Sequence, residues 1–211
     1  MLALPVVSKP TPSSDGILTQ MTDDRARLCE VIRGNSLQIG DFTLTSGKKS
    51  PYYLDCRTTT LHPLGALLTA RLMLQTIREK GIEAVAVGGL TLGADPIVAA
   101  IAVVSQIEET PIPAFIVRKE AKGHGAKRQI EGWQGPSGSR VIIVDDVCTS
   151  GGSMLEACAK VEEVGYEVVA TMCVVDREEG GTGVIAVKYP FYPIFTAAQL
   201  LSQDSVIQVD E

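Results

Sequence analysis

The stretch VIIVDDVCTSGGS, residues 141–153, decides the fold. Its first four residues, 141–144, are β-branched and predict a strand that is buried on both faces. Two carboxylates, Asp145 and Asp146, follow at the carboxyl end of this strand, and a turn rich in Ser and Gly then leads into a helix predicted over 153–164. Open α/β sheets bind ligands at the carboxyl ends of their strands, so the stretch also places a candidate ligand site.

The turn from Thr149 to Ser153 has the composition of a phosphate cradle. Its backbone N–H groups, its hydroxyls and the positive end of the following helix all favour an anion. The adjacent acids cannot bind the same phosphate; they suit sugar hydroxyls or a metal held beside it. Together these pieces indicate a site for a ribose 5-phosphate. The alternative is a plain strand-to-helix turn with solvent-facing acids, which the complete string disfavours.

Strands and helices alternate outward from this stretch. The predicted helices cover 22–32, 63–77, 95–106 and 153–164, and the predicted strands cover 42–44, 52–55, 83–87, 112–117, 141–144 and 168–175. Thr22 with Asp23 and Asp24 is the predicted cap of the first helix, while 182–195 is ambiguous and 184–187 fits strand or helix. The alternation and the β-branched strands predict an α/β domain whose parallel sheet is covered by helices on both faces.

Composition bounds the class of protein. The chain has 211 residues, 45% of them hydrophobic and 21% charged, which predicts one globular domain over 22–211 after a flexible N-terminal extension, 1–21. A net charge of −6 and 5% aromatics argue against nucleic-acid binding. The longest apolar run, 97–104, is too short to span a membrane, and the N-terminus lacks the features of a signal peptide. Five cysteines without a CxxC pair suggest neither disulfides nor zinc, and favour the reducing cytoplasm.

The string at 145–153 resembles the phosphoribosyl-diphosphate (PRPP) signature of type I phosphoribosyltransferases. The resemblance implies their fold, a central mostly parallel sheet flanked by helices, with a small N-terminal hood and a flexible catalytic loop. It implies that Asp145 and Asp146 hold the ribose 2′ and 3′ hydroxyls and that Thr149–Ser153 hold the 5′-phosphate. The PRPP-binding residues carried over from this string are Asp145, Asp146, Val147, Cys148, Thr149, Ser150, Gly151, Gly152 and Ser153. A second glycine-rich turn, Gly88–Asp95, is the family's pyrophosphate-contacting loop.

A basic segment, RKEAKGHGAKR at 118–128, holds five of the 19 basic residues. Most charge runs are solvated loops, which is the alternative here. The segment resembles the catalytic loop of the orotate branch of the family, placed at 118–130, and Gly123 and Gly125 give it freedom to close. By that resemblance the diphosphate ligands are Arg118, Lys119, Lys122 and His124. Lys122 and His124 are the preferred catalytic groups for the leaving diphosphate, and Lys119, Asp145 and Asp146 complete the predicted catalytic set.

The N-terminal string FTLTSGKKSPYYLDCR, 42–57, also resembles this branch, in which it belongs to a hood over the base, here 22–60. Many members carry Lys where this chain has Thr45, and Lys48 or Lys49 could substitute for it. Tyr52 and Tyr53 could stack on the base or pack beneath the hood, and packing is favoured for one of them.

Arg177 follows the predicted strand 168–175 at the same sheet edge as Asp145. A planar guanidinium suits a planar carboxylate, and the alternative is a surface arginine paired with Glu178 or Glu179. The position of Arg177 in the family favours binding of the orotate carboxylate, with Thr149 as a second contact.

The resemblance implies transfer of the ribose 5-phosphate of PRPP to orotate, giving orotidine 5′-monophosphate and pyrophosphate in pyrimidine biosynthesis. It implies Mg²⁺ held through PRPP and water rather than by a protein ligand set, and a cytoplasmic homodimer with active sites shared between chains. It implies neither nucleic-acid nor membrane partners. Two alternatives are a phosphoribosyltransferase for another base and a non-catalytic PRPP-sensing regulator.

Overall fold

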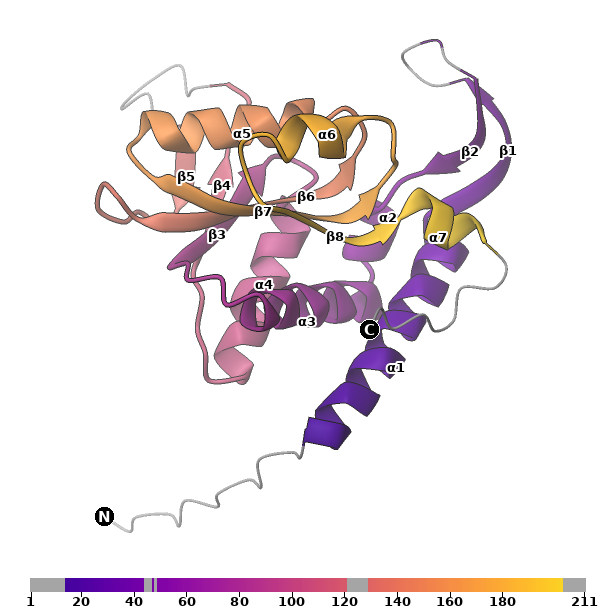
Figure 1. The fold of residues 1–211 in the computed structure, drawn as a ribbon, viewed down its shortest axis with the longest axis horizontal. Helices are drawn as coiled ribbons and strands as arrows, with labels where there is room; N and C mark the ends of the chain where they lie inside the picture. The colour runs from indigo at the N-terminus through magenta and orange to yellow at the C-terminus, as the bar shows by residue number, and fades with distance from the viewer. Residues whose placement is uncertain (1–13, 44–46, 48, 121–128, 203–211) are drawn as a thin grey trace.

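The computed structural model describes residues 14–43, 47, 49–120 and 129–202, with side chains described from residue 23 onward. Its centre is a six-stranded sheet (Figure 1). From one edge to the other the strands are β5 (Ile130–Gly132), β4 (Ala114–Val117), β3 (Ala86–Leu90), β6 (Arg140–Cys148), β7 (Glu167–Asp176) and β8 (Phe191–Thr196). Neighbouring strands are parallel except β5, which is antiparallel to β4. The expected fold class, a mostly parallel α/β sheet, is confirmed.

The strand order places a crevice beside the predicted site. The chain runs from β3 outward to β4 and β5, and then returns to β6 on the other side of β3. The connections after β3 and β6 therefore leave the sheet in opposite directions. Ligands of open α/β sheets bind where the strand order reverses in this way.

Helices cover both faces of the sheet, as the continuous apolar strands predicted. Figure 1 shows α3 (Pro63–Glu79) and α4 (Asp95–Ile107) on one face, and α5 (Gly152–Glu163) and α6 (Gly181–Ile185) on the other. The side chains of β6 alternate between the two layers. Ile142 and Val144 are buried in the cluster that includes α3 and α4, and Val141 and Ile143 are buried with α5.

The predicted hood is a separate two-stranded antiparallel sheet of β1 (Leu37–Thr43) and β2 (Lys49–Leu54). It stands to one side of the main sheet, next to α1 (Ser14–Asn35), α2 (Arg57–Thr60) and α7 (Ala197–Leu201) (Figure 1). Arg33 of α1 donates from Nε to the carbonyl of Leu200 at 2.9 Å, which ties the C-terminal helix to the N-terminal one. Among the described residues, no helix is long and apolar enough to cross a membrane.

The first helix begins earlier than its predicted cap. α1 starts at Ser14, so residues 14–21, expected in the extension, are helical, while residues 1–13 lie outside the described residues. Asp23 and Asp24 lie inside the helix and form ion pairs with Arg27 at 3.6 and 3.7 Å. Asp24 is buried and also reaches Arg71 of α3 at 3.4 Å. The acids that resemble a cap therefore serve ion pairs within and between helices.

Other elements differ from the predictions too, and the first hood strand, predicted at 42–44, begins at Leu37. β3 begins at Ala86 and includes Gly88 and Gly89, which were expected in the turn; the Phe115 ring on β4 would lie 2.1 Å from a Cβ at Gly88, so only glycine allows this close pairing. In the ambiguous region, 184 and 185 are helical in α6, and 191–196 form β8. The short edge strand β5 was not predicted, and it begins just after residues 121–128, which lie outside the described residues.

Candidate active site

The carboxyl end of β6 and the start of α5 form the predicted phosphate cradle. A hollow of about 90 Å³ opens there, lined by Asp145 and by residues 147–154. Gly151 has a φ of 80°, a left-handed conformation that glycine adopts without steric cost. The first helical residues of α5, Gly152, Ser153 and Met154, all line the hollow, so the positive helix end faces it. The hollow thus joins the start of a helix to the Ser and Gly residues of the predicted cradle, and phosphate binding there stays a prediction.

The acid pair lies beside the cradle within β6. The Oδ1 atom of Asp145 accepts a hydrogen bond from the N–H of Asp146 at 3.0 Å, and that of Asp146 accepts one from the N–H of Val147 at 2.8 Å. Burial raises the pKa of Asp145, and the charge of Asp146 raises it further. Burial also raises the pKa of Asp146. A partner that donates hydrogen bonds or brings positive charge would relieve both carboxylates, which fits sugar hydroxyls and a divalent cation.

The turn after β3 reaches the same acids. A Cβ at Gly93 would lie 2.5 Å from the Oδ1 atoms of both Asp145 and Asp146. The predicted pyrophosphate turn therefore approaches the predicted ribose-binding acids, although Gly93 and Asp145 are 52 positions apart in the sequence. The connection itself starts at Thr91 rather than at Gly88, because β3 extends through Leu90. The absence of a side chain at Gly93 is what lets the two connections meet at the crevice.

Arg57 is a cation near the acid pair, and the sequence predicted no role for it. Its Nε and Nη2 atoms donate to the two carboxylate oxygens of Asp55 at 2.9 and 2.8 Å. Its charge acts to lower the pKa of Asp146, against the larger effect of burial. Arg57 is the first residue of α2, three positions after the end of the hood strand β2. It ends the string that resembles the orotate branch, and that place in the motif was the signal available in the sequence.

Arg177 combines features of both readings that the sequence left open. It is buried, with 8% of its surface exposed, so it is not a surface arginine. Its Nε does donate to Glu179 at 2.7 Å, as the alternative expected. The guanidinium lies 4.7 Å from the ring centre of Tyr52 in the hood, and its buried Nη2 has no hydrogen-bond partner among the described residues. Arg177 is therefore held on two sides, and its shielded Nη2 has hydrogen-bonding capacity that no described residue uses.

The backbone places Arg177 beside the cradle. Its N–H donates to the carbonyl of Cys148 at 2.8 Å, and the N–H of Gly181 donates to the carbonyl of Thr149 at 3.0 Å. The connection after β7 therefore lies against the connection after β6. The two residues expected to bind orotate, Thr149 and Arg177, come from these adjoining connections.

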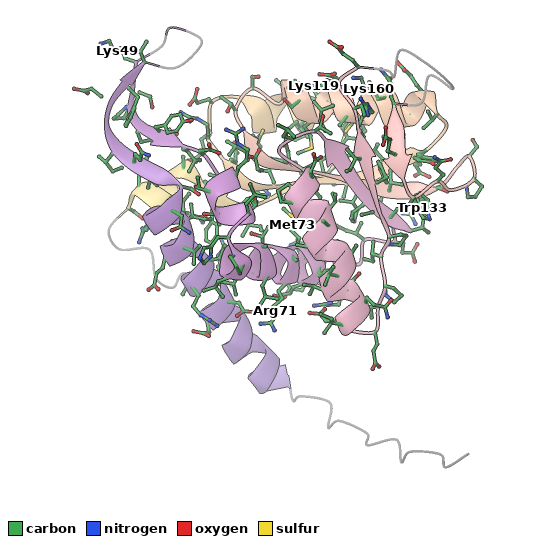
Figure 2. The ribbon with its side chains drawn as sticks, turned by 180° about the vertical axis from the view of Figure 1, so that it is seen from behind. Lys49, Arg71, Met73, Lys119, Trp133 and Lys160 are labelled. Atoms are coloured by element: carbon green, nitrogen blue, oxygen red, sulfur yellow. The ribbon has the colours of Figure 1, made fainter. Side chains whose placement is uncertain are left out.

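The two hood tyrosines differ in their surroundings. Tyr52 is buried beneath Arg177, so it packs under the hood as expected for one of them. Tyr53 is 40% exposed, and its ring lies 5.8 Å from that of Phe42. Lys49 lies at the exposed tip of the hood in Figure 2. Thr45 and Lys48 lie outside the described residues. Substitution of Lys48 or Lys49 for the family lysine stays a prediction.

Of the predicted catalytic loop, 118–130, residues 118–120 and 129–130 are described, and Ile130 already belongs to β5. Arg118 donates from Nη1 to Glu131 at 2.9 Å, and its backbone N–H donates to Gln129 at 2.8 Å, so it braces the β4–β5 pair. Lys119 is exposed, and its charge acts to lower the pKa of Asp145 in the same chain, against burial and Asp146. Lys122 and His124 lie outside the described residues. Their roles stay predictions.

No cysteine is placed to act as a nucleophile. All five cysteines are buried and unpaired, including Cys148 in the cradle. Burial, followed by the nearby Asp176 and Asp145 charges, raises the pKa of Cys148 to about 11. Burial also raises the pKa of Cys158 to about 12. A thiol must lose its proton to attack, so these groups stay inert near neutral pH.

Known proteins of similar sequence indicate the family of this chain. Residues 59–196 match the family described as the phosphoribosyl transferase domain. The orotate phosphoribosyltransferase of Aquifex aeolicus is 46% identical over 182 residues, which span 84% of this chain and 98% of that protein. That of Rhodopirellula baltica is 46% identical over 169 residues, spanning 78% and 87%.

Solved structures of an orotate phosphoribosyltransferase are similar to this chain in fold and sequence. The Mycobacterium tuberculosis orotate phosphoribosyltransferase in complex with PRPP has a TM-score of 0.70 at 38% identity, covering 84% of this chain and 98% of that one. The same enzyme in complex with Fe(III) dicitrate has a TM-score of 0.73 at 41% identity, covering 85% and 99%. With such identity over nearly the whole of these relatives, the chain belongs to the orotate phosphoribosyltransferase family.

Proposed function

We propose that this chain transfers the ribose 5-phosphate of PRPP to orotate, giving orotidine 5′-monophosphate and pyrophosphate in pyrimidine biosynthesis. The observation that carries the choice of base is Arg177, a buried guanidinium beside the phosphate cradle with one nitrogen that no described residue accepts a hydrogen bond from. A base with a carboxylate uses that donor, whereas a purine leaves it unsatisfied at a cost of about 1–3 kcal/mol.

The substrates are assigned to the site by charge. The 5′-phosphate binds at the start of α5, the ribose hydroxyls bind Asp145 and Asp146, and orotate binds Arg177 and Thr149 beneath the hood. The bond between the anomeric carbon and the diphosphate oxygen breaks as the orotate nitrogen attacks from the opposite face. The diphosphate leaves with the bonding pair, the orotate nitrogen gives up its proton to the departing diphosphate or to water, and the anomeric centre inverts without an enzyme nucleophile. Catalysis then comes from stabilising the developing charges and excluding water.

Magnesium fits the acid pair. Two neighbouring carboxylates whose pKa values are raised by burial gain from a cation, and Mg²⁺ prefers oxygen ligands together with substrate phosphates and water. When bound, the ion neutralises diphosphate charge. We propose that Asp145 and Asp146 lie next to it, and that Lys119, Lys122 and His124 supply further positive charge to the diphosphate.

We further propose a cytoplasmic homodimer whose active sites are shared, with Lys122 of one chain completing the site of the other. Val103 and Ile107 lie one turn apart on α4 and are 61% and 73% exposed, and such an apolar face suits a second copy of the chain. Five buried, unpaired thiols suit a reducing compartment.

The direct test mixes purified protein with PRPP, orotate and magnesium and identifies the product by mass spectrometry. We expect orotidine 5′-monophosphate and an equal amount of pyrophosphate. The matched control is Asp145→Asn with Asp146→Asn, which preserves side-chain shape and removes charge. Binding of PRPP without any product would instead support a non-catalytic regulator and contradict the proposal.

A further inference from the structure

Lys160 on α5 reaches across to the point where the chain leaves β4. Its ammonium donates to the backbone carbonyls of Arg118 at 3.0 Å and Lys119 at 2.7 Å, and to Glu156 one turn earlier on α5 at 2.6 Å. Only 12% of its side chain is exposed. Figure 2 shows Lys160 and Lys119 next to each other on the α5 side of the sheet. The same helix that forms the phosphate cradle thus holds the start of the basic segment.

The ammonium of Lys160 has no donor left for a ligand. A lysine has three N–H donors, and the two carbonyls and Glu156 account for all three. Lys160 therefore differs from the exposed Lys119, and a direct role on phosphate is excluded while these contacts last.

The two carbonyl contacts fix a change of chain direction. Successive residues of an extended strand alternate in orientation, so one ammonium cannot reach two successive carbonyls unless the chain bends. The strand β4 ends at Val117, and the bend follows at Lys119. The N–H of Arg118 still pairs with Gln129 at 2.8 Å, so the bend begins directly after the last cross-strand contact.

The two carbonyl contacts constrain the direction of the Lys119 side chain. Lys119 comes two residues after the carboxyl end of β4, at the same edge of the parallel sheet as Asp145 in the carboxyl half of β6, with only β3 between the two strands. Its charge also acts on Asp145 of the same chain. We infer that Lys160 is a positioning residue: by holding the carbonyls of Arg118 and Lys119 against α5, it directs the Lys119 side chain toward its own chain's site for PRPP. This inference rests on the proposed function and names the group that orients one of its cations.

The test compares steady-state kinetics of Lys160→Met, Lys119→Ala and the double variant. Met keeps the apolar stem and removes the three donors. We expect kcat/KM for PRPP to fall about ten- to hundredfold in Lys160→Met, because small misplacements of a charged group are costly, while the KM for orotate stays within about twofold. Since Lys160 acts through Lys119, adding Lys160→Met to Lys119→Ala should lower kcat/KM by less than about threefold more.

Three variants separate positioning from stability. Lys188→Met removes another lysine that pairs with α5, through Glu162 at 2.7 Å, and should leave kinetics unchanged. Glu156→Gln keeps both carbonyl contacts and should behave like wild type, and Lys160→Arg should recover part of the loss. If the losses of Lys160→Met and Lys119→Ala multiply, or if Glu156→Gln matches Lys160→Met, the inference is wrong. Absence of turnover in the wild-type chain would instead refute the proposed function.

Discussion

Replacing Arg177 by alanine tests how the chain selects its base. The guanidinium is fixed by Glu179 at Nε and by the ring of Tyr52, and its buried Nη2 is unpartnered among the described residues. Because Nε already donates to Glu179, we expect a bound carboxylate to contact the two terminal nitrogens, Nη1 and Nη2. Arg177→Ala removes both nitrogens without touching the cradle or the acid pair.

The magnitude follows from the type of bond lost. A hydrogen bond to a charged group contributes about 1.5–3 kcal/mol, which corresponds to roughly ten- to hundredfold in affinity. The pair with Glu179 keeps part of the guanidinium charge compensated, so we expect the lower half of that range. Arg177→Lys keeps the charge and loses the planar fork, and it should fall between alanine and wild type.

The assay is the KM for orotate and for PRPP, measured separately with the other substrate saturating. We expect the orotate KM to rise at least tenfold and the PRPP KM to change less than about threefold. Arg78→Ala is the matched control, because Arg78 also pairs with a glutamate at 2.7 Å but lies on α3. An unchanged orotate KM in a folded Arg177→Ala variant would show that the pair with Glu179 is purely structural.

Further predictions concern the crevice and the dimer. Gly93→Ala would place a methyl group 2.5 Å from both acids. Titration calorimetry should show that the affinity for PRPP with magnesium falls at least tenfold, while the melting temperature changes little. Unchanged affinity would show that this turn does not contribute to the PRPP site. Asp145→Asn should melt above wild type at pH 8 without ligands, and the difference should disappear toward pH 4. Burial raises the folded-state pKa of Asp145, so ionisation of this carboxyl lowers the free energy of unfolding as pH rises. The loss is about 1.4 kcal/mol for each pKa unit, and each kcal/mol lowers the melting temperature by about 2–4 °C. Equal melting temperatures of the two proteins at pH 8 would contradict this prediction. Val103→Glu with Ile107→Glu should shift sedimentation from dimer to monomer, and an unchanged dimer would place the interface elsewhere.

The central strand and cradle could be predicted because local and tertiary signals agree there. The run 141–144 has to be buried on both faces, and the Ser-Gly turn after it suits few other structures. The expected position of Arg177 just after β7 is confirmed for the same reason, since residues 168–175 of that strand are apolar except for Thr171.

Features set by distant contacts could not be predicted. Asp23 and Asp24 carry the composition of a cap, but their partners Arg27 and Arg71 make them interior helix residues. Gly88 and Gly89 carry the composition of a turn, but the Phe115 ring and the Val144 carbonyl fill the space a side chain would need. Lys160 looks in sequence like any solvated helix lysine, and only the packing of α5 against the end of β4 reveals its partners.

The most direct test of the account is the ratio of kcat/KM for orotate to that for uracil, measured by pyrophosphate release with PRPP and magnesium, with adenine and hypoxanthine as further bases. Uracil has the same ring and lacks only the carboxylate that Arg177 is proposed to bind. The account predicts a preference for orotate of at least tenfold that falls toward unity in Arg177→Ala, and no release with either purine. Equal rates with orotate and uracil, or release with a purine, would contradict it.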